Sequence, residues 1–194
     1  GRTAVGARRP PGEAAIADYC AHFLREAGLA VEVQEVAPGR PNVIGILRGT
    51  GGGRSLMLNG HVDTVGVEGM AEPFTPRRRD GHILGRGSSD MKGSIAAMLW
   101  TARALREAGV QLKGDLLIAC VVDEEYVSIG TEALVRAYTA DAAIVTEPTD
   151  LGLCLAHRGF VWVEVETAGR AAHGSRPNEG VDAITHMGRF LVAL

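Results

Sequence analysis

The sequence predicts an α/β domain with a largely parallel mixed sheet, followed by the start of an α+β unit. Short, nearly continuous apolar segments alternate with longer segments whose apolar residues recur at helical spacing, which favours an α/β domain. After residue 157 the pattern changes, because apolar and polar residues then alternate singly. The expected domains are therefore residues 1–157 and residues 158–194.

The first half of the chain predicts one helix and three strands. Apolar residues at helical spacing indicate a helix over residues 12–27, which Gly28 ends. Strands are expected at 29–36, 42–48 and 55–59. Residues 66–89 contain two prolines and five glycines, so we expect a long connection without regular structure.

The second half continues the alternation. Asp90 opens the next predicted helix, and Gly109 closes it. A later helix over 131–138 is expected to be capped by Gly130 or Thr131. The remaining expected elements are strands at 116–122, 142–145 and 159–167, a loop around His173, and a helix with Val181, Ile184, Met187 and Leu191 facing inward.

Charge and composition exclude some classes of partner. A net charge of −3 and a pI near 6.1 favour neither nucleic acid nor an anionic membrane surface. No apolar run reaches the roughly 20 residues that span a bilayer. The three cysteines lie in apolar surroundings and predict reduced thiols in a cytoplasmic protein. Because the chain starts at Gly1 and stops within a predicted helix, we expect a piece of a longer protein.

A histidine and several acidic residues stand where predicted strands end. They are His61 and Asp63 after 55–59, Glu124 and Glu125 after 116–122, and Glu147 after 142–145. Asp90, at the start of a predicted helix, is a further acidic residue of this set. Nitrogen and oxygen donors without a thiolate suit zinc, manganese or cobalt. The pattern therefore indicates a metal-dependent hydrolase.

Each of these residues also has a structural interpretation. Asp90 could be a helix N-cap, although its two oxygens could equally bridge two cations. Glu124 and Glu125 could be a solvated loop, but adjacent carboxylates at a strand end repel each other and favour a cation. One of the two can bind metal while the other acts as general base. His173 is either a surface histidine or a donor to a developing oxyanion.

The combined motifs resemble the zinc metallopeptidase family of acetylornithine deacetylase, succinyl-diaminopimelate desuccinylase, aminoacylase and glutamate carboxypeptidase. The segments that carry the resemblance are Pro10–Glu13, Gly60–Val65, Gly85–Gly93, Asp123–Glu125, Glu147–Thr149, Arg158-Gly159 and Ala172–Pro177. It implies a zinc-exopeptidase-like catalytic domain with two divalent metal ions, zinc or else cobalt or manganese. It also implies an α+β lid through which the full-length protein forms a homodimer.

The resemblance also implies a role for each site residue. His61 and Glu147 would hold one metal, Glu125 the other, and Asp90 would bridge them. Glu124 would be the general base, Asp63 would support His61, and His173 would reach a partner's active site. The expected reaction is hydrolysis of the amide bond of an N-acyl amino acid or small peptide, with Glu124 passing the proton of the attacking water to the leaving amine.

Three alternatives stay open. A carboxypeptidase or dipeptidase of the same family uses the same ligand set. A truncated, non-catalytic binding module is the second, because the family's last histidine ligand has no match before Leu194. Phosphoesterase chemistry is disfavoured because no phosphate-binding glycine loop is present. Gly66 and Met70 stand where many members have proline and, nearby, tryptophan, which bears on substrate fit.

Overall fold

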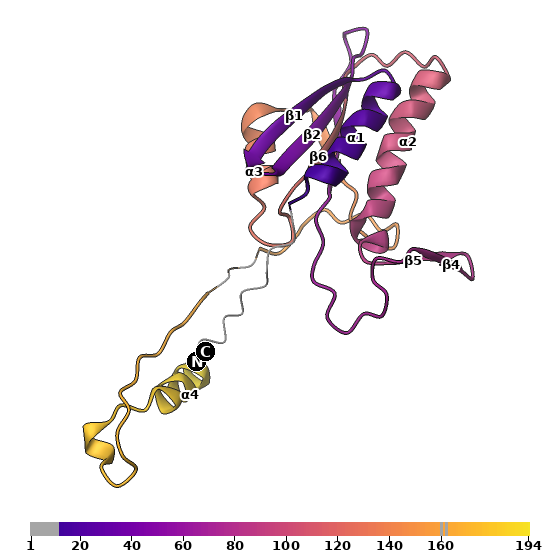
Figure 1. Cartoon of the computed structure of the whole chain (residues 1–194). Coiled ribbons are helices and arrows are strands. Elements are labelled where there is room, and N and C mark those ends of the chain that lie inside the picture. Colours follow the sequence, from indigo (N-terminus) through magenta and orange to yellow (C-terminus); the bar gives the residue numbers. More distant parts are fainter. Residues whose placement is uncertain (1–11, 160, 162) are drawn as a thin grey trace. The chain divides into compact units, whose positions relative to one another are not determined.

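The computed structural model describes residues 12–159, 161 and 163–194 of the chain. The chain divides into two compact units, Gly1–Gly152 and Leu153–Leu194. The first unit contains the sheet and three of the helices (Figure 1). The assignment of residues 1–157 and 158–194 as a catalytic and a lid domain stays a prediction.

A five-stranded sheet forms the centre of the first unit. Its strands are β1 (Ala30–Ala37), β2 (Arg40–Leu47), β3 (Leu56–His61), β6 (Leu116–Val121) and β7 (Ala142–Val145), in the order β1-β2-β6-β3-β7. β3 runs parallel to both β6 and β7, whereas β2 is antiparallel to β1 and to β6. Four strands therefore point one way and β2 alone opposes them, which confirms the largely parallel mixed sheet.

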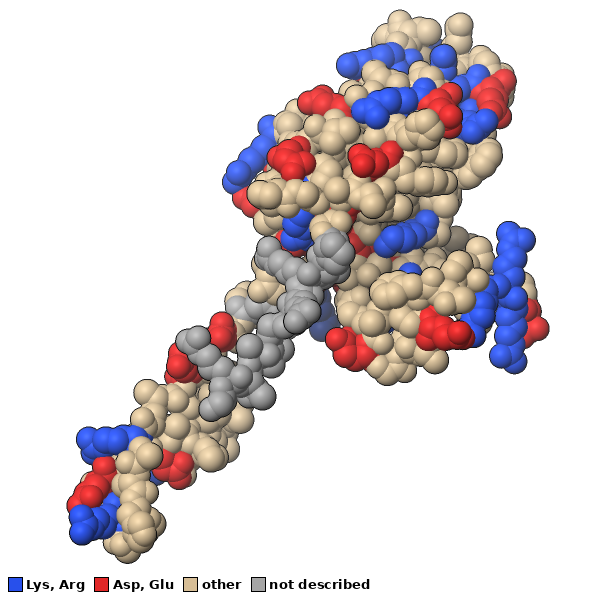
Figure 2. All heavy atoms as spheres, viewed as in Figure 1, with Lys and Arg blue, Asp and Glu red and all other residues tan. Residues whose placement is uncertain are grey.

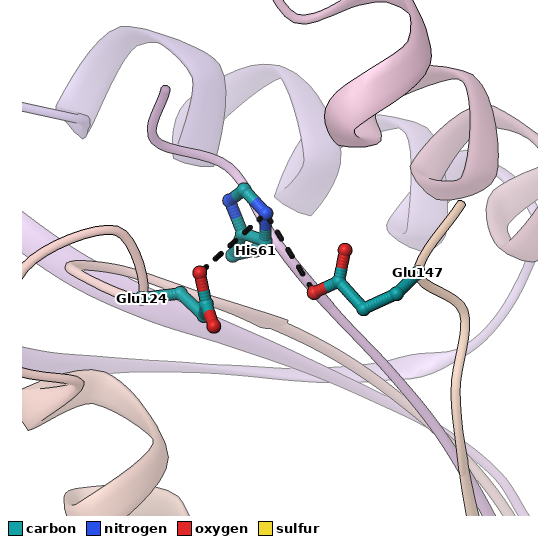
Figure 3. Close-up of side chains that lie close together, drawn as sticks. All are labelled: His61, Glu124 and Glu147. Atoms are coloured by element: carbon teal, nitrogen blue, oxygen red, sulfur yellow. Dashed lines mark ion pairs between the residues drawn. The ribbon is translucent and has the colours of Figure 1, made fainter. Parts of the chain in front are cut away.

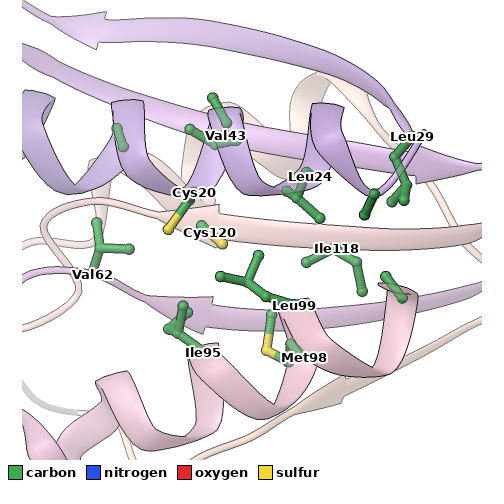
Figure 4. Close-up of a cluster of buried hydrophobic side chains, with 14 of the residues drawn as sticks. Cys20, Leu24, Leu29, Val43, Val62, Ile95, Met98, Leu99, Ile118 and Cys120 are labelled. Carbon is green, nitrogen blue, oxygen red and sulfur yellow. The ribbon is translucent and has the colours of Figure 1, made fainter. Parts of the chain in front are cut away.

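Helices cover both faces of this sheet. Successive side chains of a strand point to opposite faces, so the strands supply apolar side chains to a core on each side. On one face, α1 (Ala14–Glu26) and α2 (Gly93–Glu107) bury a core with Ile118 and Cys120 of β6 (Figure 4). On the other face, Leu117 and Ala119 pack with Leu134 of α3 (Ile129–Ala137). All six residues of β6 are buried, as expected for a central strand.

The long connection at 66–89 contains a β-hairpin that the sequence analysis did not predict. Its strands are β4 (Arg77–Arg79) and β5 (His82–Leu84), which pair antiparallel. Asp80 and Gly81 join them with φ angles of 50° and 77°, and two left-handed residues form the tight turn that suits a hairpin. The arginines of β4 are exposed, and basic side chains gather there in Figure 2.

Two predicted helix starts are wrong. Asp90 does not open α2, because it lies with extended φ and ψ of −116° and 102° at a kink within the short segment η1 (Ser88–Lys92), which precedes α2. Neither Gly130 nor Thr131 caps α3, because both lie inside that helix. Ser128, with φ 57°, precedes α3 and donates its backbone N–H to the carbonyl of Asp123, so a tight turn leads the chain into the helix.

The second unit contains η2 (Pro177–Glu179) and α4 (Ala183–Ala193). The expected strand at 159–167 is absent from the described residues of that segment, and Phe160 and Trp162 lie outside them. The apolar side chains of the helix were expected to face inward, yet none is buried and Ile184 is 85% exposed. No helix in the described part of the chain is long and apolar enough to cross a membrane.

Candidate metal centre

The ends of three parallel strands meet at one edge of the sheet. His61 is the last residue of β3, Glu124 and Glu125 come shortly after β6, and Glu147 comes shortly after β7. Asp90 reaches the same edge from η1, before α2. Parallel strands place their carboxyl ends side by side, which is why residues far apart in sequence converge here.

His61 lies at the middle of this group. Its Nε2 atom is 3.0 Å from Oδ1 of Asp90, 3.7 Å from Oε1 of Glu147 and 3.8 Å from Oε2 of Glu124. Figure 3 shows Glu124 and Glu147 approaching the ring from two sides. The possible ligand atoms form two groups, each within 4.8 Å: His61, Glu124 and Glu147, and His61, Asp90 and Glu125.

The donor set fits a divalent cation. All its atoms are imidazole nitrogen or carboxylate oxygen, the donors that zinc, manganese and cobalt accept. Oε1 of Glu125 is buried without a hydrogen-bond donor among the described residues, so it has an electron pair for a cation. Burial raises the pKa of Glu125 and of Glu147, and the charge of Asp90 adds to both shifts. A cation would relieve this mutual repulsion.

His61 is buried and held by its neighbours. Its backbone N–H donates to the sulfur of Met91 at 3.1 Å. Its Nδ1 lies 3.1 Å from the backbone oxygen of Asp63 and 3.5 Å from the Asp63 carboxylate. Burial lowers the pKa of His61, but Asp63, Glu147 and Asp90 outweigh burial and raise that pKa to about 9. Nε2 is thereby directed at the other carboxylates.

The Asp63 carboxylate has a second contact, which the sequence analysis missed. Its two oxygens accept the backbone N–H groups of Glu124 at 3.2 Å and Glu125 at 3.1 Å. Burial raises the pKa of Asp63, yet His61 and these two donors bring it below its ordinary value. Asp63 thus connects the strand end that carries the histidine to the loop that carries two acids.

Lys92 is another residue that the sequence analysis left without a role. Its Nζ donates to the carbonyl of Val62 at 2.8 Å and so holds the backbone between His61 and Asp63. Burial lowers the pKa of Lys92. The sequence signal for Lys92 is its position directly after Asp90-Met91, within the segment Gly85–Gly93 that carries the family resemblance.

Glu124 and Glu147 have different predicted roles but similar positions relative to His61. Glu124, the predicted base, and Glu147, a predicted ligand, are almost equally far from His61. The Glu124 side chain is the more exposed of the two, at 42% against 32%. The division into base and ligands therefore stays a prediction.

His173 belongs to the second unit, where it is exposed and its Nδ1 lies 2.9 Å from the hydroxyl of Ser175. Its role in oxyanion stabilisation also stays a prediction.

Known proteins resemble this chain in sequence. A deformylase of N-formyl-4-amino-5-aminomethyl-2-methylpyrimidine from Bacillus subtilis is 36% identical over 92% of the chain, and a Peptidase M20 domain-containing protein from Schizosaccharomyces pombe is 35% identical over 94%. The chain spans 46% and 45% of the length of these two relatives. It therefore corresponds to about half of each.

Solved structures share the fold. A tripeptidase from Staphylococcus aureus matches with a TM-score of 0.65 at 22% identity, covering 91% of this chain and 50% of its own. An aminopeptidase from Bacillus cereus matches with a TM-score of 0.62 at 22% identity, covering 93% and 51%. At these identities the likeness concerns the fold alone.

The family model described as "Peptidase family M20/M25/M40" matches residues 57–185, a range that includes every predicted site residue from His61 to His173. Since this match covers more than half of the sequence, the chain belongs to peptidase family M20/M25/M40.

Proposed function

We propose that the whole protein is a metal-dependent amidohydrolase that removes an acyl group from the nitrogen of a small substrate. The observation that carries the proposal is the convergence of His61 with four carboxylates, one of which has a buried oxygen with no donor among the residues that the structure describes. Such a group is costly without a cation. Two divalent ions, zinc or else cobalt or manganese, are the proposed cofactors.

His61, Glu147, Asp90 and Glu125 would hold the metal, in the arrangement that the family resemblance implies. A bound divalent cation supplies Lewis-acid chemistry, which polarises the amide carbonyl and makes water more acidic. Glu124 takes a proton from the attacking water and returns it to the leaving nitrogen as the C–N bond breaks. Its partly exposed carboxylate, close to His61 and held through its backbone by Asp63, supports this role.

The proposed substrates are N-acyl compounds with a small acyl group. N-acyl amino acids are the expectation from the sequence. Two relatives at 36% identity are named as deformylases of an N-formyl aminopyrimidine, which supports amide hydrolysis at an acylated amine. We also propose that the whole protein dimerises through the region that begins with residues 158–194 and that His173 acts on the partner's site.

The first test replaces Glu124 by glutamine in the whole protein. We expect kcat to fall by about 10²- to 10⁴-fold, because the general base is lost while the side chain keeps its size. Metal content, measured by atomic emission on the purified variant, should equal that of the unmodified protein. Undiminished turnover would contradict the role of Glu124, and loss of metal would make it a ligand instead.

The second test compares substrates. Formylated, acetylated and succinylated amines and amino acids are assayed beside dipeptides and tripeptides with the metal-loaded whole protein. Preference for the acylated compounds supports the proposal. Preference for peptides with free termini would favour a dipeptidase or carboxypeptidase, and no turnover in any class would favour a binding module.

A further inference from the structure

The loop between β6 and α3 presents Glu124 and Glu125, and the residue directly before them is held in an unusual conformation. Asp123 is only 2% exposed and has a φ of 64°. Its backbone carbonyl accepts the N–H of Ser128 at 2.6 Å, which closes the loop into a tight turn. A left-handed residue other than glycine persists where its surroundings hold it firmly.

Arg40 of β2 supplies that hold. Its guanidinium donates through Nη1 to Oδ1 of Asp123 at 2.5 Å. The same group forms a two-pronged pair with Glu13, through Nε at 2.7 Å and through Nη2. The side chains of Arg40 and Glu13 are only 15% and 10% exposed. A buried arginine with all its carboxylate partners in place has little freedom to move.

Asn42, two residues further along β2, fixes the backbone of the same loop at both ends. Its Oδ1 accepts the N–H of Val122 at 3.1 Å, and its Nδ2 donates to the carbonyl of Gly130 at 2.8 Å. A Cβ atom at position 130 would lie 2.7 Å from Oδ1 of Asn42, which is too close for a side chain. The end of the loop therefore packs against β2 at a distance that only glycine permits. β2 thus restrains the loop before, within and after its acidic residues.

A second Arg–Asp pair joins the same two strands at their other ends and offers a comparison. Arg48 follows β2 and bonds Asp115, the residue before β6, at 2.5 Å, but the two side chains are 69% and 29% exposed. Exposed pairs of this kind contribute little to stability. No predicted site residue adjoins Asp115, whereas Asp123 is followed directly by the predicted base Glu124 and the predicted ligand Glu125.

We propose that Arg40 is a positioning residue of the metal centre: by fixing Asp123 it sets the directions in which Glu124 and Glu125 present their carboxylates. Asp63 holds the backbone N–H groups of these two residues from the histidine side, and Arg40 holds the residue before them from β2. The inference rests on the proposed function only in assuming that the two acids act at a metal.

The experiment uses three variants of the 194-residue chain. Arg40→Lys keeps the charge but cannot bond Glu13 and Asp123 together through a planar fork. Asp123→Asn keeps the size and tolerates a left-handed backbone, but it removes the ion pair. Arg48→Lys is the matched control. Amide hydrogen exchange is measured on the metal-free chains, and Co²⁺ binding is followed by visible absorption.

Both Arg40→Lys and Asp123→Asn should speed exchange at Glu124, Glu125 and Ser128 by about tenfold or more while α1 and β6 exchange as before. Co²⁺ should bind about 10- to 100-fold more weakly to both, as for the loss of a residue that orients ligands. Arg48→Lys should change neither measurement.

The role of Arg40 would be overturned by any of three results: unchanged hydrogen exchange in the loop, exchange that rises equally in every segment, or undiminished Co²⁺ affinity in variants whose loop exchanges faster. If the unmodified chain binds no Co²⁺, the proposed metal function fails, while the exchange measurement still decides whether Arg40 holds the loop. The two proposals can therefore fail separately.

Discussion

His61 combines burial with a strongly negative surrounding. Burial alone would favour the neutral ring, but the carboxylates of Asp63, Glu147 and Asp90 favour the protonated one and raise the pKa to about 9. Without metal the proton occupies the place of a cation, because it neutralises the same group of acids. Metal must then displace that proton, since only neutral imidazole binds metal.

We therefore predict that metal affinity rises with pH from 6.5 to about 9. In this range each unit of pH should strengthen Co²⁺ binding up to about tenfold, because one proton leaves Nε2 per metal bound. The raised pKa values of Glu125 and Glu147 act in the same direction. Titration of the metal-free chain with Co²⁺ at several pH values measures the slope.

His173→Gln provides the control, because His173 is exposed and belongs to the second unit. Its slope should match that of the unmodified chain. An affinity that does not change with pH from 6.5 to 9 would show that His61 carries no proton in the metal-free chain.

At the scale of elements, the packing of β3 against η1 determines where Asp90 lies. Gly60 of β3 faces Met91, and a Cβ atom there would be 2.8 Å from Cε of Met91 and 3.0 Å from Cδ1 of Ile95. Met91 is fully buried and is bonded through its sulfur to the N–H of His61. A Met91 side chain shifted by such a Cβ would disturb its contact with His61, and Met91 directly follows Asp90 in the chain.

We predict that Gly60→Ala lowers both stability and metal affinity. Overpacking should cost about 1–3 kcal/mol of unfolding free energy, measured with urea. Gly45→Ala is the matched control: its Cβ would lie 2.9 Å from Cδ1 of Leu24, a similar degree of crowding in the core below α1. Both variants should lose stability, and only Gly60→Ala should bind Co²⁺ more weakly. Equal affinities would contradict the link between β3 and Asp90.

The elements also show what the sequence could predict. β6 and β7 were predicted within one residue because short apolar runs between polar residues identify strands. Only β6 is an inner strand, since β7 lies at the edge of the sheet and its residues are exposed. The hairpin of β4 and β5 was missed because its six residues are exposed and show no apolar alternation. Its one local signal was Asp80-Gly81, the residue pair that favours a tight hairpin turn.

The sequence predicted which residues make up the candidate site and that Asp63 supports His61, but it did not predict the contacts that hold the loop of Glu124 and Glu125. His61 and the acids could be recognised because each directly adjoins a predicted element. The contacts from Asp63 to the loop depend on the parallel register, which pairs His61 with Val121 and so brings residue 63 beside residues 124 and 125. Arg40 and Asn42 act across an antiparallel pairing. No local pattern in a sequence encodes strand register.

For the whole molecule, the two units carry different parts of the predicted site. The first unit, Gly1–Gly152, contains both buried clusters, the five-stranded sheet and the candidate site residues from His61 to Glu147. His173 lies in the second unit, Leu153–Leu194. Among the residues that the structure describes, none of the second unit belongs to either buried cluster. The described core residues of these clusters and the candidate ligands from His61 to Glu147 therefore belong to the first unit.

We predict that a chain ending at Gly152 folds and binds metal as the 194-residue chain does. Its unfolding free energy in urea should agree within about 0.5 kcal/mol, because none of the described residues that are removed belongs to a buried cluster. Its Co²⁺ affinity and absorption spectrum should also agree, since His61, Asp90, Glu124, Glu125 and Glu147 are all retained. A shorter chain that unfolds, or that loses Co²⁺ binding while folded, would show that residues 153–194 belong to the same folding unit or complete the metal centre.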